Sequence, residues 1–218
     1  FFLMNDKLKS NAFAKKIKDW GSELGFNHVG ITDANLKNHK KSYQKWIKLG
    51  FHGDMSYLKR HQELKFSPEK LVKDTISIIS VRLDYMPLKE NTLTVLKDKN
   101  RAYISRYALG RDYHKVIRSK LKKLAEKIKA EAEYHSTNIR IFTDSAPVLE
   151  VGLAEKAGLG WRGKHTLLLN KDHGSWFFLG EIYTNLPLPY DVEFTSHCGT
   201  CTACIDICPT KAIIAPYK

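Results

Sequence analysis

The sequence has 218 residues, 43% hydrophobic and 27% charged, a balance typical of a folded protein with one large domain and room for a small appendage. No apolar run is long enough to cross a bilayer, and no signal-peptide pattern opens the chain, so neither a membrane-embedded nor a secreted protein is expected. The net charge of +13 favours a polyanionic partner such as nucleic acid, although a solvated lysine-rich surface would give the same charge.

The first half of the chain alternates helical and strand patterns. Apolar residues at helical spacing predict a helix over about residues 5–24, and a short strand follows at 27–32. A second helix is expected at about 37–49 and ends in a loop that contains two glycines. The nearly continuous β-branched run at 75–81 predicts a buried central strand.

The second half continues the alternation. We expect a strand at about 101–109, a helix at 112–134, a strand at 138–143 and a helix opened by Pro147. Residues 165–170 and 175–183 flank a turn and predict an antiparallel hairpin. The pattern predicts an α+β fold, an α/β sandwich, with a small metal-binding module after a proline-rich linker.

All four cysteines lie in one run, which favours a metal site in a reducing, cytoplasmic compartment over disulfides. Cys198, Cys201, Cys204 and Cys208 have the spacing C-x2-C-x2-C-x3-C, typical of bacterial ferredoxins, and predict a 4Fe-4S cluster. Zinc is the competing metal, but structural zinc sites use separated ligand pairs. Cys208 either completes this cluster or serves a second one. The second possibility leads us to expect a sequence that continues beyond residue 218.

Asp144 follows an apolar strand and precedes the helix at Pro147. A carboxylate at a strand end can project into a pocket, where burial would raise its pKa and let it hold a proton for a substrate. The alternative is a helix N-cap, which the capping preference of Asp alone favours. The glycine-rich residues 158–166 (GLGWRGKHT) would let backbone N–H groups approach a ligand, although they match neither a Walker A sequence nor a dinucleotide fingerprint.

A basic segment with interleaved aromatic residues precedes Asp144. Cations neutralise phosphates and aromatic faces stack on unpaired bases, so this segment predicts contact with RNA. The alternative is a solvated amphipathic helix whose apolar face packs on the core, and both descriptions can hold at once. The cations are Arg101, Arg106, Arg111, Lys115, Arg118, Lys120, Lys122, Lys123, Lys127 and Lys129.

Six segments together resemble the epoxyqueuosine reductase family, the cobalamin- and iron–sulfur-dependent enzymes of queuosine biosynthesis. They occur in family order and span most of the chain: residues 50–58 (GFHGDMSYL), 106–114 (RYALGRDYH), 144–150 (DSAPVLE), 160–166 (GWRGKHT), 178–182 (FLGEI) and the cysteine run. Two positions depart from the family pattern, because Arg162 stands where the family usually has an apolar residue and His165 where it has Asn.

The resemblance implies reduction of epoxyqueuosine to queuosine at the wobble position of tRNA. It implies a nitroreductase-like, cobalamin-binding catalytic domain at residues 1–187 and a partial ferredoxin-like 4Fe-4S module at 188–218. Asp144 falls at the proton-donor position, and the four cysteines would bind iron. The implied cobalamin contacts are Tyr57, Arg60, Tyr107, Lys164, Thr166, Leu168 and Leu179. The implied partners are tRNA with a queuosine-type anticodon and an unidentified electron donor, with a monomer and no membrane contact expected.

Two other functions fit part of the pattern. One is another corrinoid and iron–sulfur reductase that acts on a small molecule, such as a reductive dehalogenase, against which the strong positive charge argues. The other is a non-enzymatic protein that transfers electrons or binds RNA, with its cluster serving a partner. Binding of cobalamin would distinguish the reductases from the non-enzymatic protein.

Overall fold

The structure is a computed structural model that describes residues 2–86, 92–132 and 136–218. The first half of the chain contains α1 (Phe2–Glu23), β1 (His28–Asp33), α2 (Lys37–Lys48), η1 (Ser56–Lys59), α3 (Gln62–Phe66), α4 (Pro68–Leu71), β2 (Ser77–Asp84), α5 (Thr92–Lys97) and η2 (Arg106–Ala108). The second half contains α6 (Tyr113–Glu131), β3 (Ile139–Phe142), α7 (Glu150–Lys156), β4 (Trp161–Arg162), β5 (Leu168–Leu169), β6 (Phe177–Thr184) and α8 (Ala203–Asp206).

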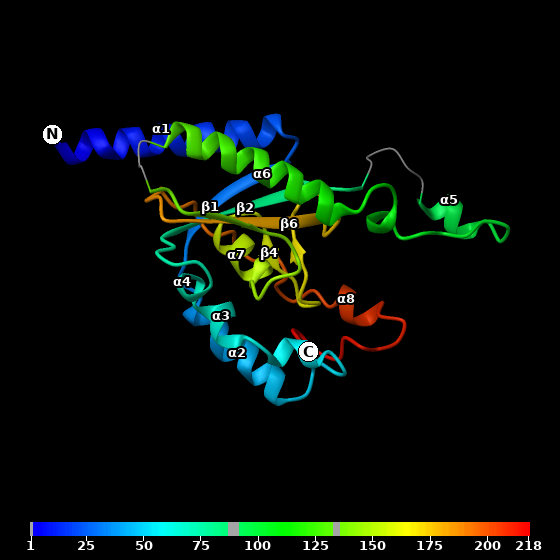
Figure 1. Cartoon of the computed structure of the whole chain (residues 1–218). Coiled ribbons are helices and arrows are strands. Elements are labelled where there is room, and N and C mark those ends of the chain that lie inside the picture. Colours follow the sequence, from blue (N-terminus) through cyan, green and yellow to red (C-terminus); the bar gives the residue numbers. More distant parts are fainter. Residues whose placement is uncertain (1, 87–91, 133–135) are drawn as a thin grey trace.

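A four-stranded antiparallel sheet in the order β1-β2-β6-β3 forms the centre of the fold. The run predicted as a central strand becomes β2, whose first six residues are buried, so that prediction is confirmed. Figure 1 shows α1 and α6 together on one face of the sheet and α7 on the other. The mixed helix-and-sheet class predicted from the sequence is therefore confirmed.

Gly180 on β6 explains how closely α6 lies against the sheet. A Cβ atom at this position would come within 2.9 Å of Ile117 and 3.0 Å of Leu121, both on α6. The apolar face of α6, predicted to pack on the core, is buried there, with the partly exposed Val116 at its margin. The helix ends at Glu131, and the predicted continuation to 133–134 lies outside the described residues.

Two predicted elements are wrong. Residues 101–109 form no strand, and only the short helix η2 lies there. The predicted hairpin does not form either, because β5 pairs with β4 in a separate two-stranded sheet while β6 joins the central sheet. A single bridge between Asn170 and Gly174 is all that remains of it. Alternation of apolar residues predicted strands correctly here but did not identify their partners.

The chain stays attached to the sheet past the predicted domain boundary at residue 187. Leu188 is buried in the main core, and its N–H donates to the hydroxyl of Ser77 at 3.2 Å. The backbone N–H of Asp191 donates to the carbonyl of Ile31 at 2.8 Å, and the backbone N–H of Ile31 donates to the Asp191 carboxylate at 2.8 Å. Within the described residues, no helix is both long and apolar enough to cross a bilayer. The division into two domains stays a prediction.

Candidate active site

Asp144 lies just past the end of β3, in the loop that leads to α7. The hydroxyl of Thr143 donates to the carbonyl of Leu179 on β6 at 3.1 Å, which fixes the start of the loop. Asp144 has a left-handed φ of 58°, a conformation that few residues other than glycine adopt. Its N–H donates to Oε1 of Glu150 at 2.6 Å. Since α7 begins at Glu150 with Leu149 at its N-cap, the alternative role of Asp144 as helix cap is wrong.

The first turn of α6 supplies the contacts of the Asp144 carboxylate. The hydroxyl of Tyr113 donates to Oδ2 at 2.9 Å, and Nε2 of His114 lies 2.9 Å from the same oxygen. Asp112, the N-cap of α6, accepts from the N–H of His114 at 2.9 Å and contacts Nδ1 of its ring at 2.8 Å. Tyr113 in turn stacks on Phe178 of β6 with ring centroids 4.1 Å apart. These contacts tie α6, β3 and β6 together at one end of the sheet.

The charges in this group differ from the sequence prediction. The hydrogen bond from His114 is the main cause that lowers the pKa of Asp144, and the Tyr113 hydroxyl adds to it. The Asp144 and Asp112 carboxylates conversely raise the pKa of His114. Because 58% of the Asp144 side chain is exposed, the apolar burial that we expected is absent. The prediction of a raised pKa for Asp144 is therefore wrong, and the carboxyl is ionised at neutral pH.

Two further carboxyl groups lie beneath the loop. Glu181, on β6, is fully buried. Its carboxyl lies beside the hydroxyl of Ser80 and the carboxyl of Glu150. Burial raises the pKa of Glu150 to about 7, and burial together with Glu150 raises the pKa of Glu181 well above its usual value. Two neighbouring buried carboxyls repel each other when both are ionised, so this pair retains a proton near neutral pH.

The sequence motifs contain these residues, but Tyr113 and His114 were considered only as aromatic neighbours of the basic segment, and Glu150 and Glu181 were given no role. Tyr113 and His114 end one motif, Glu150 ends another and Glu181 belongs to a third. The structure brings all three motifs to Asp144. One signal could have identified them. Each is a titratable residue within a short segment whose other residues fit a strand or the start of a helix.

The predicted cobalamin contacts lie in several places. Tyr57 and Arg60, in and after η1, are exposed, and so is Tyr107 on η2, which lies near enough to Tyr113 to help raise the pKa of that phenol. Leu168 and Leu179 pack in one small cluster, with Leu168 only 3% exposed, so its side chain faces the protein interior. Their roles as cobalamin contacts stay predictions.

The glycine-rich residues 158–166 approach other parts of this chain. A Cβ atom at Gly158 would lie 2.6 Å from the carbonyl oxygen of Val192, and one at Gly160 would lie 2.1 Å from that of Leu169. These two glycines are therefore explained by packing within the chain, without a ligand. Thr166 has a φ of 76° in the turn between β4 and β5.

Lys164, in the same loop, connects it to the cysteine segment. Its ammonium group donates to the carbonyls of Gly199 and Cys201, both at 2.7 Å, and its own carbonyl accepts from the N–H of Tyr217 at 2.7 Å. Nearby, the indole N–H of Trp161 donates to Sγ of Cys198 at 3.3 Å.

All four cysteines are free thiols. In the part of the chain that the structure describes, no three Cys, His, Asp or Glu side chains converge as a metal site would need. The donor chemistry nevertheless fits an iron–sulfur cluster, since four thiols lie within one exposed or half-buried segment beside the N–H donor of Trp161. Their role as ligands stays a prediction.

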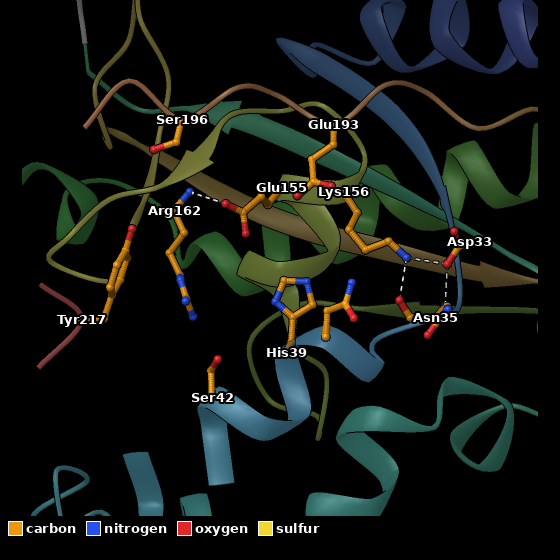
Figure 2. A pocket seen from close by; sticks show the side chains of 11 residues that line it. Asp33, Asn35, His39, Ser42, Glu155, Lys156, Arg162, Glu193, Ser196 and Tyr217 are labelled. Atoms are coloured by element: carbon orange, nitrogen blue, oxygen red, sulfur yellow. Dashed lines mark hydrogen bonds and ion pairs between the residues drawn. The ribbon is translucent and has the colours of Figure 1, made fainter. Parts of the chain in front are cut away.

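A polar cavity of about 390 Å³ lies between α2, α7 and residues 193–196 (Figure 2). Lys156 on its wall pairs with Asp33 and donates to the carbonyl of Asn35 at 2.6 Å. Arg162, one of the departures from the family pattern, lies over the ring of Tyr217 at 4.9 Å. None of the predicted site residues lines this cavity, and we assign no ligand to it.

A second cavity, of about 620 Å³, runs between the end of α1 and the first half of α6. Four cations line it: Arg111, Lys115, Lys120 and Lys123. Asp112 also lines it, so the groove is adjacent to the contacts of His114 and Asp144. The structure therefore places the basic groove next to the candidate proton donor.

Comparison with known proteins agrees with these features. The family model described as "Epoxyqueuosine reductase QueG, DUF1730" matches residues 65–145. The epoxyqueuosine reductase of Aliivibrio fischeri is 52% identical over 95% of this chain, and that of Pseudomonas aeruginosa is 52% identical over 94%. The chain spans only 56% of the length of either relative.

Solved structures give the same family. An epoxyqueuosine reductase bound to an epoxyqueuosine-modified tRNA-Tyr stem loop superposes with a TM-score of 0.84 and 26% identity, over 95% of this chain and 54% of that one. An epoxyqueuosine reductase of Bacillus subtilis, whose aspartate catalytic loop is swung out of the active site, superposes with a TM-score of 0.76 and 26% identity. The match covers 95% of this chain and 54% of that one. A B12-dependent reductive dehalogenase superposes with a TM-score of 0.53 and 14% identity, over 86% of this chain and 21% of that one, and so shares the fold alone. Over nearly all of its length, the chain described here is similar to epoxyqueuosine reductases.

Proposed function

We propose that the full-length protein carrying this sequence reduces epoxyqueuosine to queuosine in tRNA. The observation that carries this proposal is the placement of Asp144 at the sheet end, held by Tyr113 and His114, in a chain half identical to epoxyqueuosine reductases. In this reaction both C–O bonds of the epoxide break and a C=C bond forms. The oxygen leaves as water, which takes two protons and two electrons from a low-potential donor.

Asp144 is the group that we assign to protonation of the departing oxygen. Its carboxylate is more than half exposed at the rim of the site, so a substrate can reach it. In the Bacillus subtilis relative the aspartate catalytic loop occupies a position out of the active site. In this chain the loop is held by contacts from Leu179 and Glu150, which keep the carboxyl against α6.

Three exposed side chains among or beside the predicted contacts support a cobalamin site in this proposal. Tyr57, Tyr107 and Leu167 expose 60%, 53% and 53% of their area, which gives large apolar surfaces that a flat corrin ring could cover. When bound, cobalamin would supply two-electron reducing power at one centre. We assign Arg60, Lys164, Thr166, Leu168 and Leu179 as further contacts; Leu168 can contribute only through its backbone, because its side chain is buried.

An iron–sulfur cluster would be held by Cys198, Cys201 and Cys204, with Cys208 as a ligand of the same or a second cluster. When bound, it would supply single electrons to the reaction. The two-domain description, a nitroreductase-like core at 1–187 and a ferredoxin-like module at 188–218, belongs to this proposal. So do an electron donor as partner, a monomeric state and a cytoplasmic location.

The tRNA would lie along the basic groove between α1 and α6. Its four cations can neutralise phosphates on either side of the wobble nucleotide, and the groove opens beside Asp112. One structure of the family contains an epoxyqueuosine-modified tRNA stem loop, which supports a nucleic-acid substrate of this kind.

The test uses tRNA that contains epoxyqueuosine, incubated anaerobically with the full-length protein, cobalamin, reconstituted clusters and a chemical reductant. We expect queuosine in the digested tRNA by mass spectrometry. Asp144→Ala should lower the rate at least ~100-fold, as loss of a general acid does, while the cobalamin absorption spectrum stays unchanged. An Asp144→Ala protein as active as the parent would remove Asp144 from the mechanism, and absence of queuosine with the parent would remove the proposed function.

A further inference from the structure

The proposed reaction needs a proton donor, but the environment of Asp144 keeps its carboxyl ionised. Two donors, the Tyr113 hydroxyl and Nε2 of His114, meet the same oxygen, Oδ2. Hydrogen bonds of this kind stabilise the charged form of a carboxyl, as the lowered pKa reflects. The proton that leaves with the epoxide oxygen must therefore first come to Asp144 from another group.

His114 occupies the position from which such a proton can come. Its ring lies between two carboxylates, with Nδ1 2.8 Å from Oδ1 of Asp112 and Nε2 2.9 Å from Oδ2 of Asp144. The neutral ring has a single N–H, so one nitrogen would then face a carboxylate oxygen with a lone pair. Only the imidazolium satisfies both contacts. The raised pKa of His114 agrees with this geometry.

The position of the ring is fixed by its neighbours. Asp112 is the N-cap of α6 and accepts from the backbone N–H of His114 as well as contacting its ring. The Tyr113 ring lies against the imidazole at 3.9 Å and is itself stacked on Phe178. The side chain of His114 is only 34% exposed. The first turn of α6 therefore holds the His114 ring in the position from which it contacts Asp144.

We propose that His114 stores the proton that Asp144 delivers, passing it from Nε2 to Oδ2 while Asp112 holds the ring; this inference rests on the proposed function. The transfer moves one proton and no electrons: the N–H bond of His114 breaks, the O–H bond of Asp144 forms, and Asp144 then protonates the departing oxygen. Neutral His114 regains its proton from solvent. His114 acts through Asp144, so it is a positioning and relay residue.

Other charges around the ring set the pH range. Asp112 and Asp144 contact it directly, and both favour the imidazolium. Arg118, which donates to Ser145, and Lys115 are the nearby cations on the same helix. Tyr113 stacks on the ring from the same helix, and Glu150, at the start of α7, interacts with its charge. Tyr107 and Glu181 lie one step further, beside Tyr113 and Glu150.

The test compares single-turnover rates of the full-length enzyme with His114→Gln from pH 5 to 9, with His28→Gln as a control on an exposed histidine of β1. We expect His114→Gln to be slower by ~10- to 100-fold at pH 7.5 and to recover as the pH falls toward that at which Asp144 itself takes up a proton. The control should keep the parent profile. An unchanged rate and profile in His114→Gln would overturn the proposal.

A second variant covers the case in which His114→Gln disturbs α6. Asp112→Asn keeps the N-cap oxygen but removes its charge, so the descending limb of the pH profile should move to lower pH. Direct NMR titration of the imidazole, which needs no activity, should show the His114 pKa falling in Asp144→Asn. A His114 titration that does not respond to Asp144 would overturn the relay even if the parent enzyme were inactive, whereas inactivity alone would count against the proposed function.

Discussion

The surroundings of Asp144 and the cysteine segment (residues 192–218) are built differently. Around Asp144, hydrogen bonds from α6, β6 and α7 fix every group of the proposed acid chain. In the cysteine segment, Lys164 and Trp161 hold the backbone and one sulfur, while Val192, Ile207 and Ile214 expose 88%, 80% and 64% of their area. Acid–base groups can be positioned by protein alone, whereas thiols that share a metal are commonly organised by the metal.

The largest effect that would sharpen this contrast is expected from Cys204→Ser. The full-length protein should lose almost all iron bound at this segment after anaerobic reconstitution, because a hydroxyl is a poor replacement for a thiolate. Iron content and the visible absorption band measure the loss, and Thr200→Ala, an exposed neighbour, is the matched control. The NMR titration of His114 should not change. A shifted His114 titration would mean that the two regions are not independent.

A smaller effect is expected from Lys164→Ala, since Lys164 ties the loop between β4 and β5 to the cysteine segment. Two charge-assisted hydrogen bonds to the carbonyls of Gly199 and Cys201 would be lost, each worth about 1.5–3 kcal/mol. The cluster should then be removed by a chelator several-fold faster, as followed by absorbance. Lys171→Ala, an exposed lysine in the turn before β6, is the control. Equal removal rates in both variants would show that the metal alone orders this segment.

The smallest effect concerns the carboxyl pair beneath the loop. The pKa of Glu150 rises from 4.5 to about 7 on folding, and that of Glu181 rises as well, so the folded state binds more protons than the unfolded state in this range. Stability is therefore complete below pH 4.5 and falls as the pH rises toward 7. Glu181→Gln should remove on the order of 2 kcal/mol of this fall.

Hydrogen exchange of β2 and β6 peptides in the full-length protein, at pH 5 and 8, measures this effect after correction for intrinsic exchange rates. Glu126→Gln, at an exposed position of α6, serves as the control. If Glu181→Gln lost as much protection against hydrogen exchange between pH 5 and pH 8 as the parent does, Glu150 and Glu181 would not share a proton.

Long periodic segments were predictable from the sequence. The helices that became α1 and α6 and the strand that became β2 were located within a few residues, because one apolar face repeats through each. The hairpin was not, since Gly160 allows close approach to the backbone of Leu169 and β5 pairs with β4 instead. A periodic pattern identifies a buried face but not the strand that lies beside it.

The candidate site was predictable in its residues but not in its charges. Asp144 and the cysteines were identified from segments that match the family, and their roles stay predictions. The ionisation of Asp144 depends on His114, 30 residues earlier in the sequence. No local pattern could show that contact, because it arises only when the start of α6 is placed beside the end of β3.

The position of β6 in the sheet has a consequence for biosynthesis. The strand is the last of the four to leave the ribosome, yet it lies between β2 and β3. Until it is made, those two strands each present an unpaired edge and the groups around Asp144 have no common support. The nascent chain therefore passes through an incomplete sheet that is open to aggregation, and the active site can form only at the step that closes this gap.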